Sequence, residues 1–235
     1  MGQAVLWGVV AASPLFVGAV LAIVRVWPPR WLGVVLGFGA GALMASIAFE
    51  LWEEGLDRAG PVPLLIGVAL GAISYYIGAR ILDARAAKKK GDAGGGQLAV
   101  GALLDGIPEQ LVLGIGLASG EPVSVALVVA ILVSNLPESI GSAADLLEGG
   151  MARSRVLLLW GGVAVVCALA TLAGFGLASV TDDTFRAAAS GFAAGALLVM
   201  LVDSMVPEAQ SKAKESTGLA TVLGFALAAG LSFAS

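Results

Sequence analysis

Two short motifs in the chain combine a polar side chain with a Pro-Glu step. One runs from Asp105 to Glu109 (Asp-Gly-Ile-Pro-Glu), and the other runs from Ser134 to Glu138 (Ser-Asn-Leu-Pro-Glu). In each motif an oxygen-bearing side chain precedes the Glu by three or four residues, which places both on one face of a helix. The Pro removes one backbone hydrogen bond and leaves a carbonyl oxygen without its partner. Carboxylate, amide and carbonyl oxygens are suitable ligands for a divalent cation.

The segments that carry these motifs are apolar enough to cross a bilayer. Apolar residues make up 58% of the chain and charged residues 13%, and the mean hydropathy is +0.95, which excludes an ordinary soluble domain. Cutting the sequence at charge, Gly and Pro gives eight spans of sufficient length. They cover residues 4–24, 31–51, 62–82, 98–118, 122–145, 154–180, 184–206 and 216–234. The predicted fold is all-α: a polytopic bundle of eight transmembrane helices in a single transporter domain, residues 1–235.

Three acidic residues of the two motif-bearing spans fall at hydrocarbon depth. They are Asp105, Glu109 and Glu138, and neither span contains a basic residue that could pair with them. An ionised carboxylate there costs at least about 2.5–3.5 kcal/mol on insertion scales, so a cation should neutralise it. A proton or a divalent metal ion would serve. The alternative is that the acids stay protonated and form hydrogen bonds between helices.

Further polar residues follow the bundle from one side of the membrane to the other. Glu50 and Glu54 lie toward the outer end of the second span, and Asp203, Ser204 and Glu208 lie toward the inner end of the seventh. Together with the motif residues they form a plausible cation path, although Glu54 and Glu208 could be ordinary solvated helix ends. The predicted metal ligands are Asp105, Glu109, Asn135, Glu138, Asp203 and Glu50. The additional pathway residues are Glu54, Ser204 and Glu208.

The basic residues predict the orientation of the bundle. Eleven of the 13 Lys and Arg residues flank the loops after the first, third, fifth and seventh spans, and only Arg58 and Arg186 lie on the other side. Short basic loops stay cytoplasmic, so both termini are expected outside the cytoplasm in a multi-pass protein of the cell membrane. Residues 83–97 are expected to be a flexible basic cytoplasmic loop that contacts anionic lipid and not nucleic acid. Asp182 and Asp183 are expected to be helix-capping loop residues on the outer side.

The second and seventh spans share a pattern of small residues. Gly37 to Leu43 reads Gly-Phe-Gly-Ala-Gly-Ala-Leu, and Gly191 to Leu197 reads Gly-Phe-Ala-Ala-Gly-Ala-Leu, although the two spans cross the membrane in opposite directions. This pattern predicts an inverted repeat, with helices 1–3 and 6–8 arranged around helices 4 and 5, as in many transporters. The alternative is that the small residues only allow close helix packing.

With eight spans and Pro-Glu motifs on the fourth and fifth, the chain resembles the ZIP (Zrt/Irt-like) family of divalent metal transporters. Members carry His-Asn-x-Pro-Glu-Gly on the fourth span, x-x-x-Pro-Glu-Gly on the fifth and His-Glu-x-x-Pro-Glu on the seventh.

Matching the Pro-Glu steps sets Asp105 in the His position and Gly106 in the Asn position. On the fifth span Asn135 and Glu138 match, with Ser139 where Gly is usual. On the seventh, Asp203 and Ser204 replace His-Glu before the matching Pro207-Glu208.

The resemblance implies a two-metal site on the fourth and fifth spans, elevator-like movement, a homodimer and passage of Zn, Mn or Fe toward the cytoplasm. This chain departs from the pattern, because it contains no His, Gly106 has no ligating side chain and Ser204 replaces a Glu. We therefore expect one principal site of oxygen ligands, which favours Mn²⁺ or Fe²⁺ more than the usual set does. Glu109 and Glu138 should converge to within about 10 Å, the reach of one ion and a bridging water.

Two other functions use the same residues. A proton-coupled transporter of a non-metal substrate would use the acids as a proton relay. An intramembrane protease would need an aspartate dyad, for which Asp105 and Asp203 are the available pair, but neither lies in the Gly-x-Gly-Asp setting of that chemistry. The chain is therefore not expected to be an enzyme.

Overall fold

The computed structural model describes residues 1–88, 94–118 and 123–233, and in these ranges it leaves out the side chains of residues 82, 83, 85–88, 94–100 and 105. The described residues form eight helical rods, which confirms the predicted all-α class. Two rods are composite. One consists of α2 (Pro29–Ser46), η1 (Ile47–Trp52) and α3 (Glu53–Ala59). The other consists of α8 (Asp183–Met200), η2 (Leu201–Met205) and α9 (Val206–Ala213). The remaining rods are α1 (Gly2–Val24), α4 (Pro61–Lys88), α5 (Gly94–Ala118), α6 (Val125–Glu148), α7 (Arg153–Val180) and α10 (Ser216–Ser232).

Seven of these rods are long and apolar enough to cross a membrane, and Ser216–Ser232 is a shorter apolar helix. The protein is therefore a multi-pass membrane protein. Large apolar side chains such as Leu6, Ile73 and Leu223 lie exposed on the outside of the bundle, where lipid is the natural solvent. The ends of the predicted 83–97 loop are helical, since α4 reaches Lys88 and α5 begins at Gly94, and residues 89–93 lie outside the described residues.

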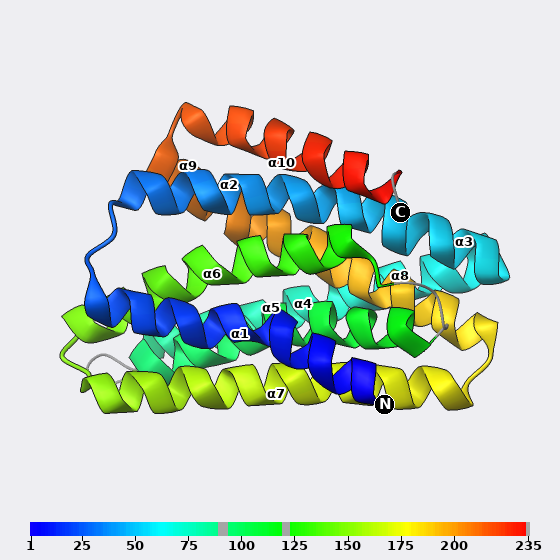
Figure 1. The fold of residues 1–235 in the computed structure, drawn as a ribbon, viewed down its shortest axis with the longest axis horizontal. Helices are drawn as coiled ribbons and strands as arrows, with labels where there is room; N and C mark the ends of the chain where they lie inside the picture. Colours follow the sequence, from blue (N-terminus) through cyan, green and yellow to red (C-terminus); the bar gives the residue numbers. More distant parts are fainter. Residues whose placement is uncertain (89–93, 119–122, 234–235) are drawn as a thin grey trace.

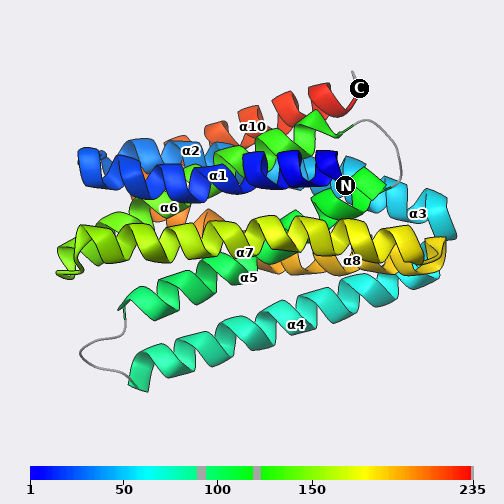
Figure 2. The same ribbon diagram turned by 60° about the horizontal axis from the view of Figure 1, so that its bottom comes forward.

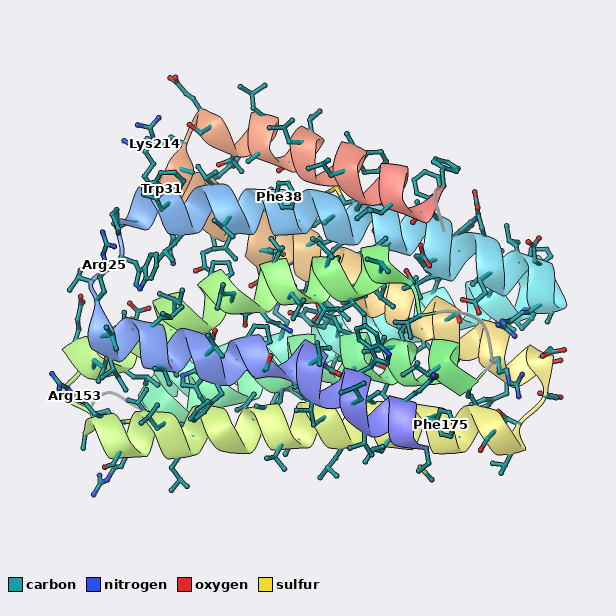
Figure 3. All side chains as sticks on the ribbon, in the orientation of Figure 1. Arg25, Trp31, Phe38, Arg153, Phe175 and Lys214 are labelled. Carbon is teal, nitrogen blue, oxygen red and sulfur yellow. The ribbon has the colours of Figure 1, made fainter. Side chains whose placement is uncertain are left out.

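The rods run roughly parallel or antiparallel to one another, with loops at both ends of the bundle (Figures 1 and 2). Arg25, Arg153 and Lys214 lie at one end, as Figure 3 shows, and we call it the basic end. Both termini lie toward the opposite end, with the turns from α3 to α4 and from α7 to α8 (Figure 1). At the start of α8 the Asp182 side chain accepts a hydrogen bond of 2.9 Å from the Phe185 amide, which confirms the cap predicted at Asp182. Asp183 is the first residue of the helix and not a loop residue.

Small residues let the rods pack at backbone distance. The tightest pairs are α2 with α10, α4 with α8 and α5 with α7, while α6 packs against both α1 and α2. A Cβ atom at Gly41 would lie 1.9 Å from the Thr221 carbonyl oxygen, and one at Gly195 would lie 2.1 Å from that of Val68. No side chain fits such a gap, so these glycines are required by the packing.

The two composite rods have the same internal construction. Gly37 and Gly191 are 154 positions apart (191 − 37). The first residues of α2 and α8 have the same separation, and so do their last residues. In both rods a π-helical segment follows directly. Gly41 on α2 packs on α10, and its counterpart Gly195 on α8 packs on α4. The pattern is reciprocal, because Gly224 of α10 lies against Phe38 and Gly71 of α4 lies against Phe192.

Candidate cation site

The centre of the bundle holds a polar contact between α5 and α6. The Asn135 side-chain amide donates a hydrogen bond to a Glu109 carboxylate oxygen, with Nδ2 and Oε2 3.3 Å apart. Glu109 is 1% exposed and Asn135 is 2% exposed. Both follow from the predicted motifs: α5 and α6 continue as helices through Pro108 and Pro137, so the two motif faces meet. A buried carboxylate with a polar partner on a neighbouring helix is a suitable ligand for a cation.

Glu109 opens onto a cavity of about 140 Å³. Glu138 lines the same cavity, so the two Glu side chains of the Pro-Glu steps do face one space, although the distance between their carboxylates stays a prediction. Ser204 of η2 and Glu208 of α9 line it as well, as two of the predicted pathway residues. Its other walls come from Leu36, Gly101, Ala102, Ser134, Ser142, Met200 and Met205.

The cavity extends toward the basic end of the bundle. Glu208 accepts a hydrogen bond of 2.7 Å from Lys212 on the next turn of α9, and the pair is partly exposed. The Lys212 ammonium lies beside α6, 2.9 Å from the point where a Cβ of Gly141 would stand. Glu208 therefore lines the same cavity as the buried Glu109 and pairs with a cation of the chain itself.

Two other predicted residues lie at the opposite end of the bundle. Glu50 and Glu54 line a shallow outer pocket of about 420 Å³ together with Glu53, Asp57 and Arg58, and both also line a small pocket between η1, α5 and α6. Glu50 accepts a hydrogen bond from Ser232 of α10. Glu54 accepts a hydrogen bond of 2.9 Å from the Arg58 Nε.

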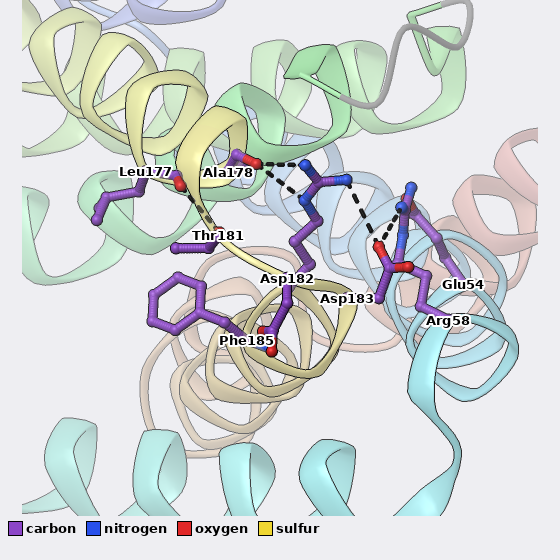
Figure 4. Close-up of polar contacts among 9 residues, drawn as sticks. Glu54, Arg58, Leu177, Ala178, Thr181, Asp182, Asp183 and Phe185 are labelled. Carbon is purple, nitrogen blue, oxygen red and sulfur yellow. Dashed lines mark hydrogen bonds and ion pairs between the residues drawn. The ribbon is translucent and has the colours of Figure 1, made fainter.

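Arg58 belongs to a polar network that joins three rods at this outer end (Figure 4). The Oδ1 atom of Asp183 lies 4.0 Å from Nη1 of Arg58 and 3.5 Å from Nη1 of Arg186. The Arg186 guanidinium also donates a hydrogen bond to the Ala178 carbonyl oxygen. The network links α3, α7 and the start of α8. It thereby positions Glu54 at the outer mouth.

An apolar layer borders the small pocket that Glu50 and Glu54 line. The layer contains five side chains that are at most 7% exposed and belong to one hydrophobic cluster, namely Leu51, Leu113, Leu117, Leu127 and Ile131. The four leucines line the small pocket of Glu50 and Glu54, while Glu109 lines the cavity that leads to Glu208, and the two spaces share no lining residue.

Asp203 and Asp105, two further predicted ligands, are not among the described residues that line the cavity. Asp203 is exposed on η2 and does not line the cavity, although its neighbour Ser204 does. The backbone of Asp105 lies in α5, one turn before Glu109, but its side chain lies outside the described residues. Among the described side chains, no group of three His, Cys, Asp or Glu residues is close enough to hold a metal ion.

Two buried polar residues close to the site were not predicted as site residues. Gln110 is fully buried beside Glu109 and accepts a hydrogen bond of 2.5 Å from Thr171 of α7, and its Nε2 has no described partner. Ser139 is buried where α6 crosses α1, within 2.7 Å of the Asn135 carbonyl oxygen and 3.0 Å of that of Pro14. Two features of the sequence could have indicated these residues: Gln110 directly follows the Pro-Glu step, and Ser139 occupies a position where Gly is usual.

Comparisons with known proteins agree with transport in general. No family model matches the chain. A protein of Arabidopsis thaliana named "Putative zinc transporter" is 26% identical over 196 residues, which cover 80% of this chain. The matched region is 31% of that protein, so the chain spans about a third of the length of this relative.

Proposed function

We propose that the chain transports a divalent metal cation through an oxygen-ligand site on α5 and α6, toward the cytoplasm. One observation carries the proposal: Glu109 is buried, contacts Asn135 across the helix pair and opens onto a cavity that Glu138 and Glu208 share. A carboxylate at this depth is costly without a cation, and this site offers further oxygens within one space. Asp105, one turn before Glu109, is the proposed further ligand.

The contact between Asn135 and Glu109 suggests how the site would take up its substrate. The amide nitrogen of Asn135 faces the carboxylate, so a cation arriving at Glu109 meets the positive end of the amide dipole. Rotation of the amide by half a turn presents Oδ1 in place of Nδ2. We infer that the hydrogen bond is exchanged for two cation contacts, which keeps Glu109 partnered both with and without substrate.

The matched construction of the two composite rods supports alternating access. Equivalent glycines pack α2 on α10 and α8 on α4, as expected for an inverted repeat of helices 1–3 and 6–8 around helices 4 and 5. Two such halves of opposite orientation can exchange an inward-open for an outward-open state of similar energy. In our proposal α5 and α6 carry the site past the apolar layer in an elevator-like movement within a homodimer.

The substrate is proposed to be Zn²⁺, Mn²⁺ or Fe²⁺. The name of the Arabidopsis relative points to zinc, while the absence of His from the sequence and the oxygen ligands favour harder ions than a His-rich site would. Zn²⁺ should still bind, since divalent affinities follow the Irving-Williams order, and strict zinc selectivity in competition would contradict this ligand set.

The first test is uptake of Zn²⁺, Mn²⁺ and Fe²⁺ into proteoliposomes that contain the purified protein. Glu109→Gln keeps the shape of the side chain but removes the charge, and we expect at least a tenfold loss of uptake for each ion that is transported. Glu148→Gln is the matched control, because Glu148 is exposed at the end of α6 and should leave uptake unchanged. Equal uptake by the Glu109 variant and the parent would overturn the proposal.

Calorimetric binding of the same ions tests Asp105 directly. Asp105→Asn should weaken binding about tenfold or more if this carboxylate is a ligand, and Asp105→His should shift preference toward Zn²⁺. The same titration separates the alternative function. A protein that binds none of the ions, yet moves protons into liposomes in a Glu109-dependent way, would be a proton-coupled transporter of another substrate.

A further inference from the structure

A second cavity lies at the basic end of the bundle, in the crevice between α1, α2 and α6. It measures about 320 Å³, which is the scale of a pocket for a small organic molecule. Its body is apolar and is formed by Leu21, Leu32, Val35, Leu136, Pro137 and Ile140. Its mouth is formed by the connection from α1 to α2, with Arg25, Trp27 and Pro28, and by Trp31 at the start of α2. The cavity shares no lining residue with the cation cavity.

The mouth is built around a positioned guanidinium group. The Trp27 indole donates a hydrogen bond of 3.2 Å to the Leu21 carbonyl oxygen, which fixes the ring against the end of α1. The Arg25 guanidinium lies over this ring, 5.5 Å from its centroid, at a cation–π distance. Within the described part of the chain no carboxylate forms an ion pair with Arg25. This contact does not use the N–H donors of the guanidinium group in hydrogen bonds to the ring, and such donors bind phosphate well.

The charge and depth of the cavity identify its occupant. Arg25 and the exposed Trp31 lie at the basic end with Arg153 and Lys214, as Figure 3 shows, so the mouth lies at the predicted cytoplasmic headgroup level. The apolar body extends from there toward the membrane centre, along α6. A ligand that fits has an anionic phosphate at one end and a hydrocarbon chain at the other. Anionic lipids of the cytoplasmic leaflet have this form.

We propose that this cavity is a binding site for one anionic phospholipid, with the phosphate on Arg25 and one acyl chain against α6. The wall of the site includes Leu136 and Pro137, which lie between Asn135 and Glu138 in sequence. The acyl chain thus supports the back of the helix segment that carries the proposed cation ligands. The proposal does not depend on metal transport, and its test contains no metal.

The test is native mass spectrometry of the full-length protein with equal amounts of added phosphatidylglycerol and phosphatidylcholine. We expect one phosphatidylglycerol to bind about tenfold more strongly than phosphatidylcholine, which is the scale of a charge-assisted contact. Arg25→Gln should lower phosphatidylglycerol binding to the phosphatidylcholine level. Arg153→Gln removes the same charge at the same end, from a position that does not line the cavity, and should change binding less than twofold.

Two further arms separate the acyl chain from the headgroup. Val35→Phe places a ring in the apolar body and should weaken both lipids, while thermal unfolding verifies that the variant is folded. Glycerol 3-phosphate, which has the anion without the chain, should fail to displace the lipid at matched concentration. Each of four results would overturn the proposal. They are equal binding of the two lipids, a loss of phosphatidylglycerol binding in Arg153→Gln as large as that in Arg25→Gln, unchanged lipid binding in a folded Val35→Phe, and displacement of the lipid by glycerol 3-phosphate.

Discussion

Lys212 is a cation that the chain itself places at the inner mouth of the cation cavity. It pairs with Glu208 at 2.7 Å, and this Glu lines the space that Glu109 and Glu138 share. A divalent ion on its way to the cytoplasm would meet Glu208 with its charge already neutralised. In the proposed transport, we expect the ion pair to weaken the hold of Glu208 on the substrate and to favour its release.

Removing the ammonium should strengthen cation binding at the mouth. Lys212→Gln leaves Glu208 without its ion-pair partner, and we expect the apparent affinity for the transported ion to rise about threefold while maximal uptake falls. A partly exposed pair contributes at most about 1 kcal/mol, which limits the effect to roughly fivefold. Concentration-dependent uptake into proteoliposomes measures both quantities.

Lys214→Gln is the control for this change, because it removes an equal charge two positions later, at an exposed residue. Similar shifts in the two variants would indicate a general surface-potential effect and would contradict a specific role for Lys212. A Glu208→Gln variant that keeps the parent affinity would contradict the role of Glu208 in the path.

At the scale of residues, the motifs predicted the helix faces on which two of the candidate ligands lie. A Pro-Glu step with a polar residue one turn earlier fixes the face of a helix, so the approach of Glu109 and Asn135 follows from local geometry. The exposed position of Asp203 did not follow, since it depends on how η2 rotates the residues beyond Met200. A π-helical segment inserts its extra residue without a clear local signal, and every later side chain then points in a different direction.

At the scale of elements, the starts of the helices could be predicted within about four residues because apolar length and flanking charge determine them. The rods that end at Ala59, Lys88 and Ala213 continue six to eight residues past their predicted ends, since helix geometry extends beyond the apolar span. Packing partners could not be predicted from length, since lipid-exposed and buried faces are both apolar in this chain. The glycine contacts supply the missing information. Gly41 and Gly195 occupy equivalent positions of the two composite rods and bring equivalent neighbours to backbone distance.

We expect Gly41→Ala and Gly195→Ala to destabilise the protein by similar amounts. An added methyl group would lie 1.9 Å from the Thr221 oxygen in one case and 2.1 Å from the Val68 oxygen in the other, so a helix must shift. Such overpacking costs about 1–3 kcal/mol. Thermal unfolding in one detergent measures the loss as a lower apparent melting temperature.

Gly162→Ala on α7 is the matched control for both substitutions. Nothing lies within 4 Å of its added Cβ, and Ala stabilises a helix relative to Gly by about 0.5–1 kcal/mol. Its melting temperature should be equal to or above that of the parent. A large loss in only one of the two packing variants would argue against equivalent roles in a repeat.

At the scale of the whole molecule, the distribution of charge gives the bundle a direction. Arg25, Arg153 and Lys214 gather at one end, and Figure 1 shows both termini toward the other. The cation cavity leads from Glu109 toward the basic end, so the proposed direction of transport and the state of the cavity both depend on this orientation. The positive-inside rule predicts that the basic end faces the cytoplasm.

Labelling of single cysteines in intact cells tests this orientation. The native Cys167 is buried and should react little, so new cysteines can be read against a low background. We expect Gly2→Cys and Thr181→Cys to react with a membrane-impermeant maleimide from outside, because both sites lie at the end opposite the basic one. Arg153→Cys should react only after the membrane is permeabilised. The reverse labelling pattern would mean that the bundle has the opposite orientation. The cavity that Glu109 lines would then face outward. The proposed passage toward the cytoplasm would in that case begin from this state and not end in it.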